Sequence, residues 1–137
     1  GRSPLVIIDG AHNVAGALAL AAALDEEFTH GPRTLVVGLL AEKDPVEMFK
    51  ALDLASATRL VACRPPSPRG RDPKEVAAAA VAAGMSPSQV DVVDAPGDAL
   101  AYAVSVTPVD GQVVVTGSLY VVGAARTAFR SGQKSDF

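Results

Sequence analysis

Residues 5–13, with the sequence LVIIDGAHN, decide the fold that we predict for this chain. Four apolar residues predict a buried strand, and a long apolar helix follows the polar turn that begins at Asp9. Such a turn places a ligand site at the carboxyl end of the strand, where N–H groups of the helix point outward. A matching turn at residues 116–118, with the sequence TGS, follows an apolar run near the other end. The rest of the chain is predicted to be the scaffold for these two turns.

Short apolar runs alternate with helical patterns along the whole sequence. Strands are predicted at residues 5–8, 34–38, 59–63, 90–93 and 112–115, and helices at 14–28, 44–53, 72–83, 96–106 and from 119 to about 130. Strands that alternate with helices form βαβ units and a mostly parallel sheet. Their continuous apolar character is expected when helices cover both faces. We therefore predict one three-layer α/β/α Rossmann-like domain over residues 1–137.

Several residues mark where the helices begin and end. Asp44 and Asp72 each precede a proline, which is typical of an N-cap followed by the first helical residue. Gly16 is expected to let the first helix approach the sheet. His30 precedes a glycine and a proline, so we interpret it as a helix-end residue rather than a ligand.

Composition limits the class of protein. The chain has 137 residues, of which 49% are hydrophobic, and a chain of this size buries roughly 68–70% of its unfolded surface. A net charge of −3 argues against non-specific binding to nucleic acid or to an anionic membrane. Cys63 alone offers no disulfide framework, which fits a reducing cytoplasm. The apolar run at residues 14–24 is too short to span a bilayer.

Several well-known motifs are absent. The sequence has no GxxxxGK[ST] loop to hold a triphosphate, no GxGxxG after the first strand and no GxSxG nucleophile turn. No group of His, Cys and acidic residues has the spacing of metal ligands, so no metal site is predicted in this chain.

The residues of the strand-end turns leave functional and structural interpretations open. Asp9 can accept hydrogen bonds from a ribose diol, polarise His12, or satisfy the backbone N–H groups of its own turn. His12 can donate to a phosphate or a carboxylate. Asn13 is most simply the N-cap of the first long helix. Ser118 is either an ordinary cap or a ligand for a carboxylate or phosphate.

Two cations on other strand-end loops complete the candidate site. Lys43 and Arg69 suit phosphate or carboxylate binding, although most such side chains are simply solvated. An anion at a helix N-terminus gains only about 0.3–1 kcal/mol, and micromolar affinity needs about 8 kcal/mol. The site therefore resembles one wall of a cleft. The abrupt start of the chain, a strand four residues after Gly1, fits a fragment of a longer protein.

Four sequence segments in order resemble a known family. The stretches DGAHN (9–13), VGLLAEKD (37–44), SPR (67–69) and TGSLY (116–120) are similar to the C-terminal domain of folylpolyglutamate synthase. In many bacteria this enzyme is also dihydrofolate synthase, and it belongs to the Mur ligase superfamily. The resemblance covers essentially the whole chain.

This resemblance implies an ATP-dependent acid–amino-acid ligase of the cytoplasm. Its N-terminal domain carries the phosphate loop, the Mg²⁺ ligands and a carbamylated lysine, and it is absent from residues 1–137, so the isolated chain is expected to be inactive. An acyl phosphate forms on the carboxylate of dihydropteroate or folate, and the amine of L-glutamate then attacks it. The resemblance implies nucleotide contacts for Asp9, His12 and Asn13. It also implies a catalytic His12 between nucleotide and glutamate, and glutamate binding by His12 and Ser118.

The resemblance also has implications for the sheet and has clear departures. It implies that the strand before Ser118 lies beside the strand before Asp9, with an additional antiparallel strand that this chain lacks. Val14 replaces the usual proline, and Glu42 replaces the usual aspartate. Residues 70–72, with the sequence GRD, replace Ala-Leu-Pro. We assign no role to Glu42, and the role of Arg69 stays open.

Two alternatives remain. One is another amino-acid ligase of the Mur superfamily, such as an enzyme that acts on a peptidoglycan precursor. The other is a non-catalytic Rossmann-like binding module.

Overall fold

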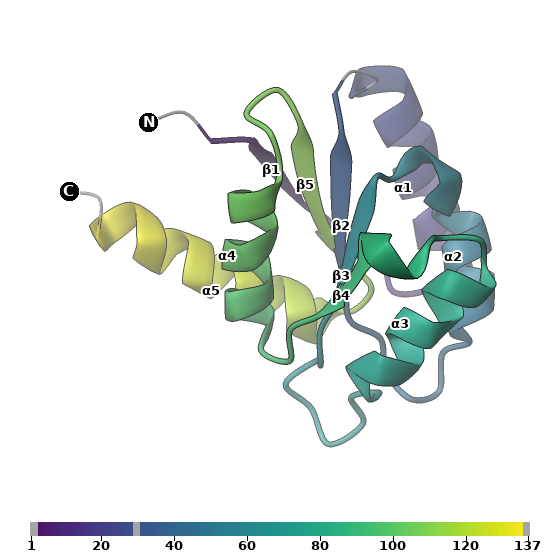
Figure 1. Ribbon diagram of the computed structural model, residues 1–137. Helices are drawn as coiled ribbons and strands as arrows, with labels where there is room; N and C mark the ends of the chain where they lie inside the picture. Colours follow the sequence, from purple (N-terminus) through teal and green to yellow (C-terminus); the bar gives the residue numbers. More distant parts are fainter. Residues whose placement is uncertain (1–2, 29–30, 136–137) are drawn as a thin grey trace.

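The computed structural model describes residues 3–28 and 31–135, so His30 lies outside the described residues. Five parallel strands form one sheet in the order β1-β5-β2-β3-β4 (Figure 1). The strands are β1 (Leu5–Ile8), β2 (Arg33–Val37), β3 (Arg59–Ala62), β4 (Val90–Val92) and β5 (Gln112–Thr116). The predicted fold is confirmed, and so is the pairing of β1 with β5.

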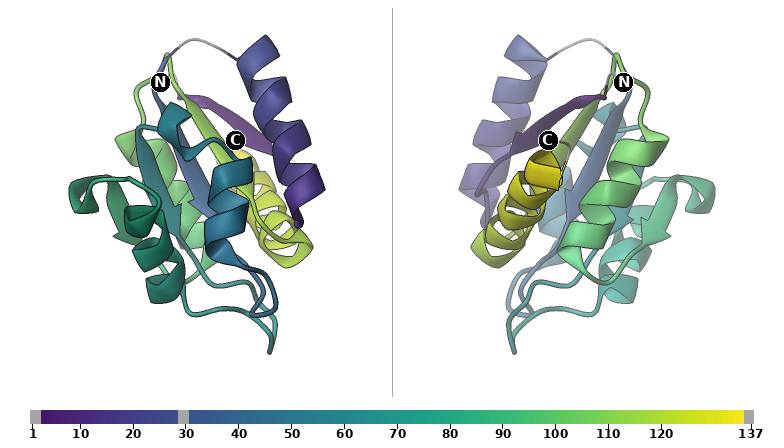
Figure 2. Two further views of the ribbon diagram at one scale, coloured as in Figure 1. Left: turned by 90° about the vertical axis from the view of Figure 1, so that its right-hand side faces the viewer. Right: turned by 90° about the vertical axis from the view of Figure 1, so that its left-hand side faces the viewer.

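Helices cover both faces of this sheet. One face carries α1 (Val14–Glu27), α2 (Pro45–Ala51) and α3 (Pro73–Ala82), and the other carries α4 (Pro96–Val106) and α5 (Leu119–Ser135). Figure 2 shows the two faces in turn, with α1, α2 and α3 in front of the sheet in the left view and α4 and α5 in front of it in the right view. Two short 3₁₀ helices, η1 (Leu54–Ser56) and η2 (Pro87–Gln89), were not predicted. The last helix extends five residues beyond its predicted end at about residue 130.

The hydrophobic core has two halves because alternate residues of each strand point to opposite faces. Leu35, Val37 and Val114 pack under α1, α2 and α3. Val36 and Val115 belong to the half that packs under α4 and α5. All five are at most 2% exposed, and burying such a side chain stabilises the fold by roughly 1.5–3 kcal/mol. This two-sided burial explains why the strands read as continuous apolar runs.

The predicted N-caps are present. The side chain of Asn13 accepts a hydrogen bond from the Gly16 amide at 2.8 Å, and Asp44 and Asp72 accept from Val46 and Lys74. Gly16 has a different role from the predicted one, which was to let α1 approach the sheet.

A Cβ atom on Gly16 would lie 3.3 Å from the Cα atom of Ala11. Gly16 therefore lets α1 approach the turn that precedes it rather than the sheet.

The strand order brings three polar turns to one edge of the sheet. Ile8 pairs with Val115, and Val37 pairs with Thr116. The carboxyl ends of β1, β5 and β2 are therefore neighbours. In open parallel sheets this edge is where ligands bind.

Candidate functional site

Hydrogen bonds join the turn after β1 to the turn after β5. The carbonyl oxygen of Ala11 accepts from the Gly117 amide at 3.0 Å and from the Thr116 hydroxyl at 3.3 Å. The Asp9 amide donates to the carbonyl of Val115 at 3.0 Å. The two motifs that lie more than 100 residues apart in sequence thus form one structural unit.

Glycines allow the turns after β5 and β2 to approach closely. Gly117 has a φ of +112°, and a Cβ atom there would lie 2.4 Å from the carbonyl oxygen of Gly38. A Cβ atom on Gly38 would lie 2.6 Å from a methyl group of Val121. A side chain at Gly117 would push the turn after β5 away from Gly38, and a side chain at Gly38 would push the turn after β2 away from α5.

Asp9 has one carboxylate oxygen engaged within its own turn. Its Oδ1 atom accepts from the Ala11 amide at 2.9 Å, which is the structural role that the sequence left open. Its Oδ2 atom makes no hydrogen bond to the described residues and is available to a ligand. Asp9 and Asn13 line a hollow of about 440 Å³ whose apolar side is formed by α1. Besides these two, the residues around this first hollow are Gly10, Ala11, His12, Gly16, Ala19, Leu20 and Ala23.

His12 lies between this first hollow and a second one. The side chain is exposed, and its Nδ1 atom is 2.9 Å from the carbonyl oxygen of Gly10. Because a carbonyl only accepts, this contact favours the tautomer with the proton on Nδ1. Nε2 is then the ring atom that can meet a ligand, as an acceptor in the neutral form or as a donor in the cation.

The second hollow, of about 280 Å³, brings together most of the predicted site residues. It is lined by His12, Leu40, Glu42, Lys43, Arg69, Gly117, Ser118, Leu119 and Tyr120. Asp9 and Asn13 line only the first hollow. The arrangement therefore divides the predicted residues into two adjoining groups that share His12.

Ser118 forms part of the floor of the second hollow. It is 1% exposed, and its hydroxyl oxygen accepts from the Val121 amide at 3.0 Å, as an N-cap does. The contact that the structure shows is thus the ordinary cap. The hydroxyl proton remains able to donate. Leu119 and Tyr120, next in sequence, are exposed at the rim.

The two candidate cations differ in their partners. The Arg69 Nη1 atom is 3.1 Å from the carboxylate of Glu42, and both side chains are largely exposed. Exposed pairs of this kind contribute about 0–1 kcal/mol to stability. The Lys43 ammonium forms no ion pair within residues 3–28 and 31–135. Glu42, for which we predicted no role, therefore neutralises Arg69 and not Lys43.

Sequence reasoning missed Arg71. Its guanidinium donates to the carbonyl oxygens of Ala41 and Lys43 and forms an ion pair with Glu75 at 2.9 Å. The only sequence signal was the departure from the family pattern at residues 70–72.

The groups with shifted pKa values lie outside both hollows. Burial, with a smaller effect of the Asp94 charge, raises the pKa of the Cys63 thiol to about 12. Burial lowers the pKa of Arg33, and a hydrogen bond to Asp91 raises the pKa of Tyr102. The Cys63 thiol consequently stays protonated at neutral pH and is no nucleophile.

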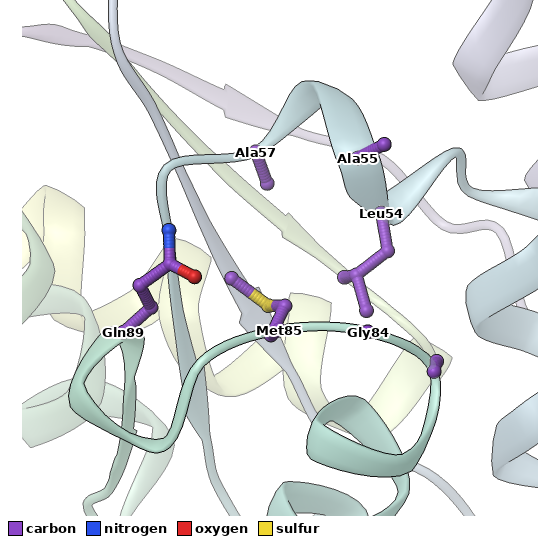
Figure 3. A pocket seen from close by; sticks show the side chains of 7 residues that line it. Leu54, Ala55, Ala57, Gly84, Met85 and Gln89 are labelled. Atoms are coloured by element: carbon purple, nitrogen blue, oxygen red, sulfur yellow. The ribbon is translucent and has the colours of Figure 1, made fainter.

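A further hollow lies at the opposite, amino-terminal edge of the sheet (Figure 3). It has a volume of about 210 Å³ and is bordered mainly by apolar residues, among them Leu54, Ala57 and Met85. The side-chain Nε2 atom of Gln89 donates to the carbonyl oxygen of Thr58 at 3.1 Å. None of the lining residues is titratable, so we do not regard this hollow as a reaction site.

Two features are absent from the residues that the structure describes. None of their helices has both the length and the apolar character needed to cross a membrane. No three of their His, Cys, Asp or Glu side chains form a group that could hold a metal ion.

Residues 1–119 match the family model described as Mur ligase, glutamate ligase domain. The chain belongs to this family. The resemblance inferred from the four motifs is thereby confirmed at the level of the family.

The chain is similar to curated proteins that are named folylpolyglutamate synthases. The enzyme of Lacticaseibacillus casei is 34% identical over 131 residues, which are 96% of this chain and 28% of the relative. The dihydrofolate synthase/folylpolyglutamate synthase of Mycobacterium tuberculosis is 36% identical over 142 aligned residues, covering 93% of this chain and 28% of the relative. The chain thus spans less than a third of either protein.

Solved structures confirm the fold. The folylpolyglutamate synthase of M. tuberculosis complexed with ADP and AMPPCP superimposes with a TM-score of 0.80 at 36% identity, over 90% of this chain and 29% of that one. E. coli FolC in complex with DHPP and ADP has a TM-score of 0.81 at 20% identity, over 93% of this chain and 29% of that one. The latter likeness supports the fold alone.

Proposed function

We propose that this chain is the C-terminal domain of a cytoplasmic, ATP-dependent ligase that adds L-glutamate to folate or dihydropteroate through an acyl phosphate. The observation that carries the proposal is the pair of adjoining hollows that share His12. The folylpolyglutamate synthases among its relatives support the choice of substrates. Dependence on an N-terminal domain of the same polypeptide belongs to the proposal, because the chain has no phosphate loop of its own.

The first hollow fits the nucleoside part of ATP. The Oδ2 atom of Asp9 can accept hydrogen bonds from ribose hydroxyls, and the alanine and leucine side chains of α1 offer an apolar surface for a base. Asn13 contributes by capping α1, which fixes the turn beside the nucleotide. The triphosphate and Mg²⁺ are assigned to the N-terminal domain, where Mg²⁺ would neutralise phosphate charge.

The second hollow fits an amino acid with two carboxylates. Lys43 supplies positive charge, Arg69 lies in the same hollow paired with Glu42, and the Ser118 hydroxyl can donate from the floor. Neutral His12 can accept at Nε2 a proton from the ammonium group of glutamate, which leaves the amine free to attack, or its cation can stabilise charge between the two hollows. His12 is therefore the catalytic residue of the proposal.

The domain supplies only one wall of the cleft. Several lining residues of the second hollow, including His12, Glu42 and Arg69, are exposed to solvent. Closure by the N-terminal domain would remove water and strengthen each electrostatic contact. This requirement explains why the isolated chain is expected to be inactive.

The proposal is tested with the full-length protein in an assay with ATP, L-glutamate and folates. We expect His12→Ala to lower kcat/KM for glutamate by about 10²-fold and Ser118→Ala to raise the KM for glutamate by about tenfold. Ser105→Ala, an exposed serine on α4, is the control and should behave as wild type. Wild-type kinetics in both site variants would refute the site assignment.

A panel of acceptors separates the alternative within the superfamily. The family model covers glutamate ligase domains in general, so another acid acceptor is compatible with the match. Activity on a peptidoglycan precursor and none on folates would favour that alternative. An upstream reading frame without a GxxxxGK[ST] loop would favour the binding module.

A further inference from the structure

The turn at residues 40–43 connects β2 to α2 and presents Glu42 and Lys43 to the second hollow. One internal hydrogen bond closes it, from the Lys43 amide to the Leu40 carbonyl at 3.1 Å. Its other backbone contacts go to the loop after β3. The Ala41 amide donates to the Arg69 carbonyl at 2.7 Å, and Leu40 forms an antiparallel bridge with Gly70.

Arg71 adds a side-chain clamp to this backbone pairing. Its Nη2 atom donates to the carbonyl oxygens of Ala41 and Lys43, the latter at 2.7 Å. Its Nη1 atom meets the Glu75 carboxylate, one helical turn later, at 2.9 Å. The planar guanidinium is therefore fixed by α3 on one side and holds two carbonyls of the turn on the other. Its side chain is only 21% exposed, which limits competition from water.

We propose that Arg71 is a positioning residue that holds the turn at residues 40–43, so that the Lys43 ammonium faces the anionic group bound in the second hollow. This inference rests on the proposed function, in which that group is a carboxylate of L-glutamate. Arg69 is neutralised by Glu42, whereas Lys43 has no ion pair among the described residues. Lys43 is thus the cation of the hollow whose charge is available. Arg71 acts on the substrate only through Lys43.

The test compares two arginine variants in the full-length protein. Arg71→Met keeps an unbranched apolar stem and removes every donor. Arg64→Met is the matched control, because Arg64 lies on the same loop and pairs with Asp94 and Asp72 without contacting the turn.

We expect Arg71→Met to raise the KM for L-glutamate by about tenfold, since charged hydrogen bonds that fix the turn are lost. The kcat and the KM for ATP should stay within about twofold of wild type. Arg71→Lys should give an intermediate KM, because one ammonium cannot reproduce the fork. Arg64→Met should leave all three constants unchanged.

A second readout does not depend on activity. Deuterium uptake by a peptide covering residues 39–44 should become about tenfold faster in Arg71→Met and unchanged in Arg64→Met. A merely stabilising role would lower the Tm and leave the KM for glutamate unchanged, and that result overturns the proposal. Equal KM increases in both arginine variants would also overturn it.

Failure of the proposed function is recognised separately. If the wild-type protein adds a different amino acid, the KM for that amino acid replaces the KM for glutamate in the comparison. If it transfers none, the proposed function fails while the uptake experiment still decides whether Arg71 holds the turn. Unchanged uptake in Arg71→Met overturns the positioning role in either case.

Discussion

The turn after β1 and the turn after β2 both border the second hollow, but they are held in different ways. The first is held mainly by backbone atoms, because the carbonyl of the buried Ala11 accepts from the Gly117 amide and the Asp9 amide donates to the Val115 carbonyl, with one further hydrogen bond from the Thr116 hydroxyl. The second combines backbone pairing to the loop after β3 with the guanidinium of Arg71, which comes from that same loop. Close contacts between backbones require glycines and a defined main-chain conformation. A contact made by a side chain can instead be supplied by a different residue.

Breaking the backbone-held turn should have the largest effect. We expect Gly117→Ala to lower the free energy of unfolding by about 3 kcal/mol, because the backbone is at φ +112° and the new Cβ would meet the Gly38 carbonyl. Urea denaturation measures the change. Gly123→Ala is the control, since nothing lies within 4 Å of its Cβ position in α5, and it should stabilise by about 0.5–1 kcal/mol. Equal stabilities would mean that the turns can separate freely.

The buried thiol of Cys63, beneath the second turn, allows the packing there to be tested by changing the pH. Cys63 directly follows β3, and its sulfur would lie 3.2 Å from a Cβ atom on Gly38. Burial raises the pKa of this thiol from 9.0 to about 12 in the folded state. The folded protein therefore keeps the proton longer than the unfolded chain. Stability from this thiol is fully present below pH 9 and is lost as the pH rises toward 12.

We expect wild type to lose about 1.4 kcal/mol relative to Cys63→Ala for each pH unit above 9. The measurement is the difference between the two unfolding free energies at pH 8 and pH 10. Groups that titrate in both proteins cancel in this difference. A difference independent of pH would show that water reaches the thiol beneath the turn.

The contrast between the two turns also explains what the sequence could predict. The DGAHN and TGSLY turns follow strands with strong apolar patterns, so their elements, the Asn13 cap and their shared edge of the sheet were predictable from local signals. Arg71 and Lys43 are 28 residues apart, and nothing near either residue indicates a contact. The Glu42–Arg69 pair was missed for the same reason.

Two predictions made from local sequence patterns were also wrong. Gly16 was expected to let the first helix approach the sheet, but its nearest neighbours lie in the turn before α1. The second helix ends at Ala51 rather than at Asp53, which has a φ of 55°. A left-handed residue other than glycine leaves no clear composition signal.

The smallest expected effect concerns the exposed pair of Glu42 and Arg69. Both side chains are accessible to water, so Glu42→Gln should change the free energy of unfolding by less than about 0.5 kcal/mol. The same change releases Arg69 toward the second hollow, which should lower the KM for L-glutamate by about two- to fivefold in the full-length protein. Added salt should reduce this gain, because exposed charges are screened.

Glu47→Gln is the matched control for this variant. Glu47 is an exposed acid on α2 that lines a different surface hollow and forms no ion pair with the described residues. Its loss should leave the KM for glutamate unchanged, since it does not neutralise Arg69. If Glu42→Gln instead raises the KM, Glu42 itself contacts the substrate, and the second turn then contributes an acid and a cation rather than Lys43 alone.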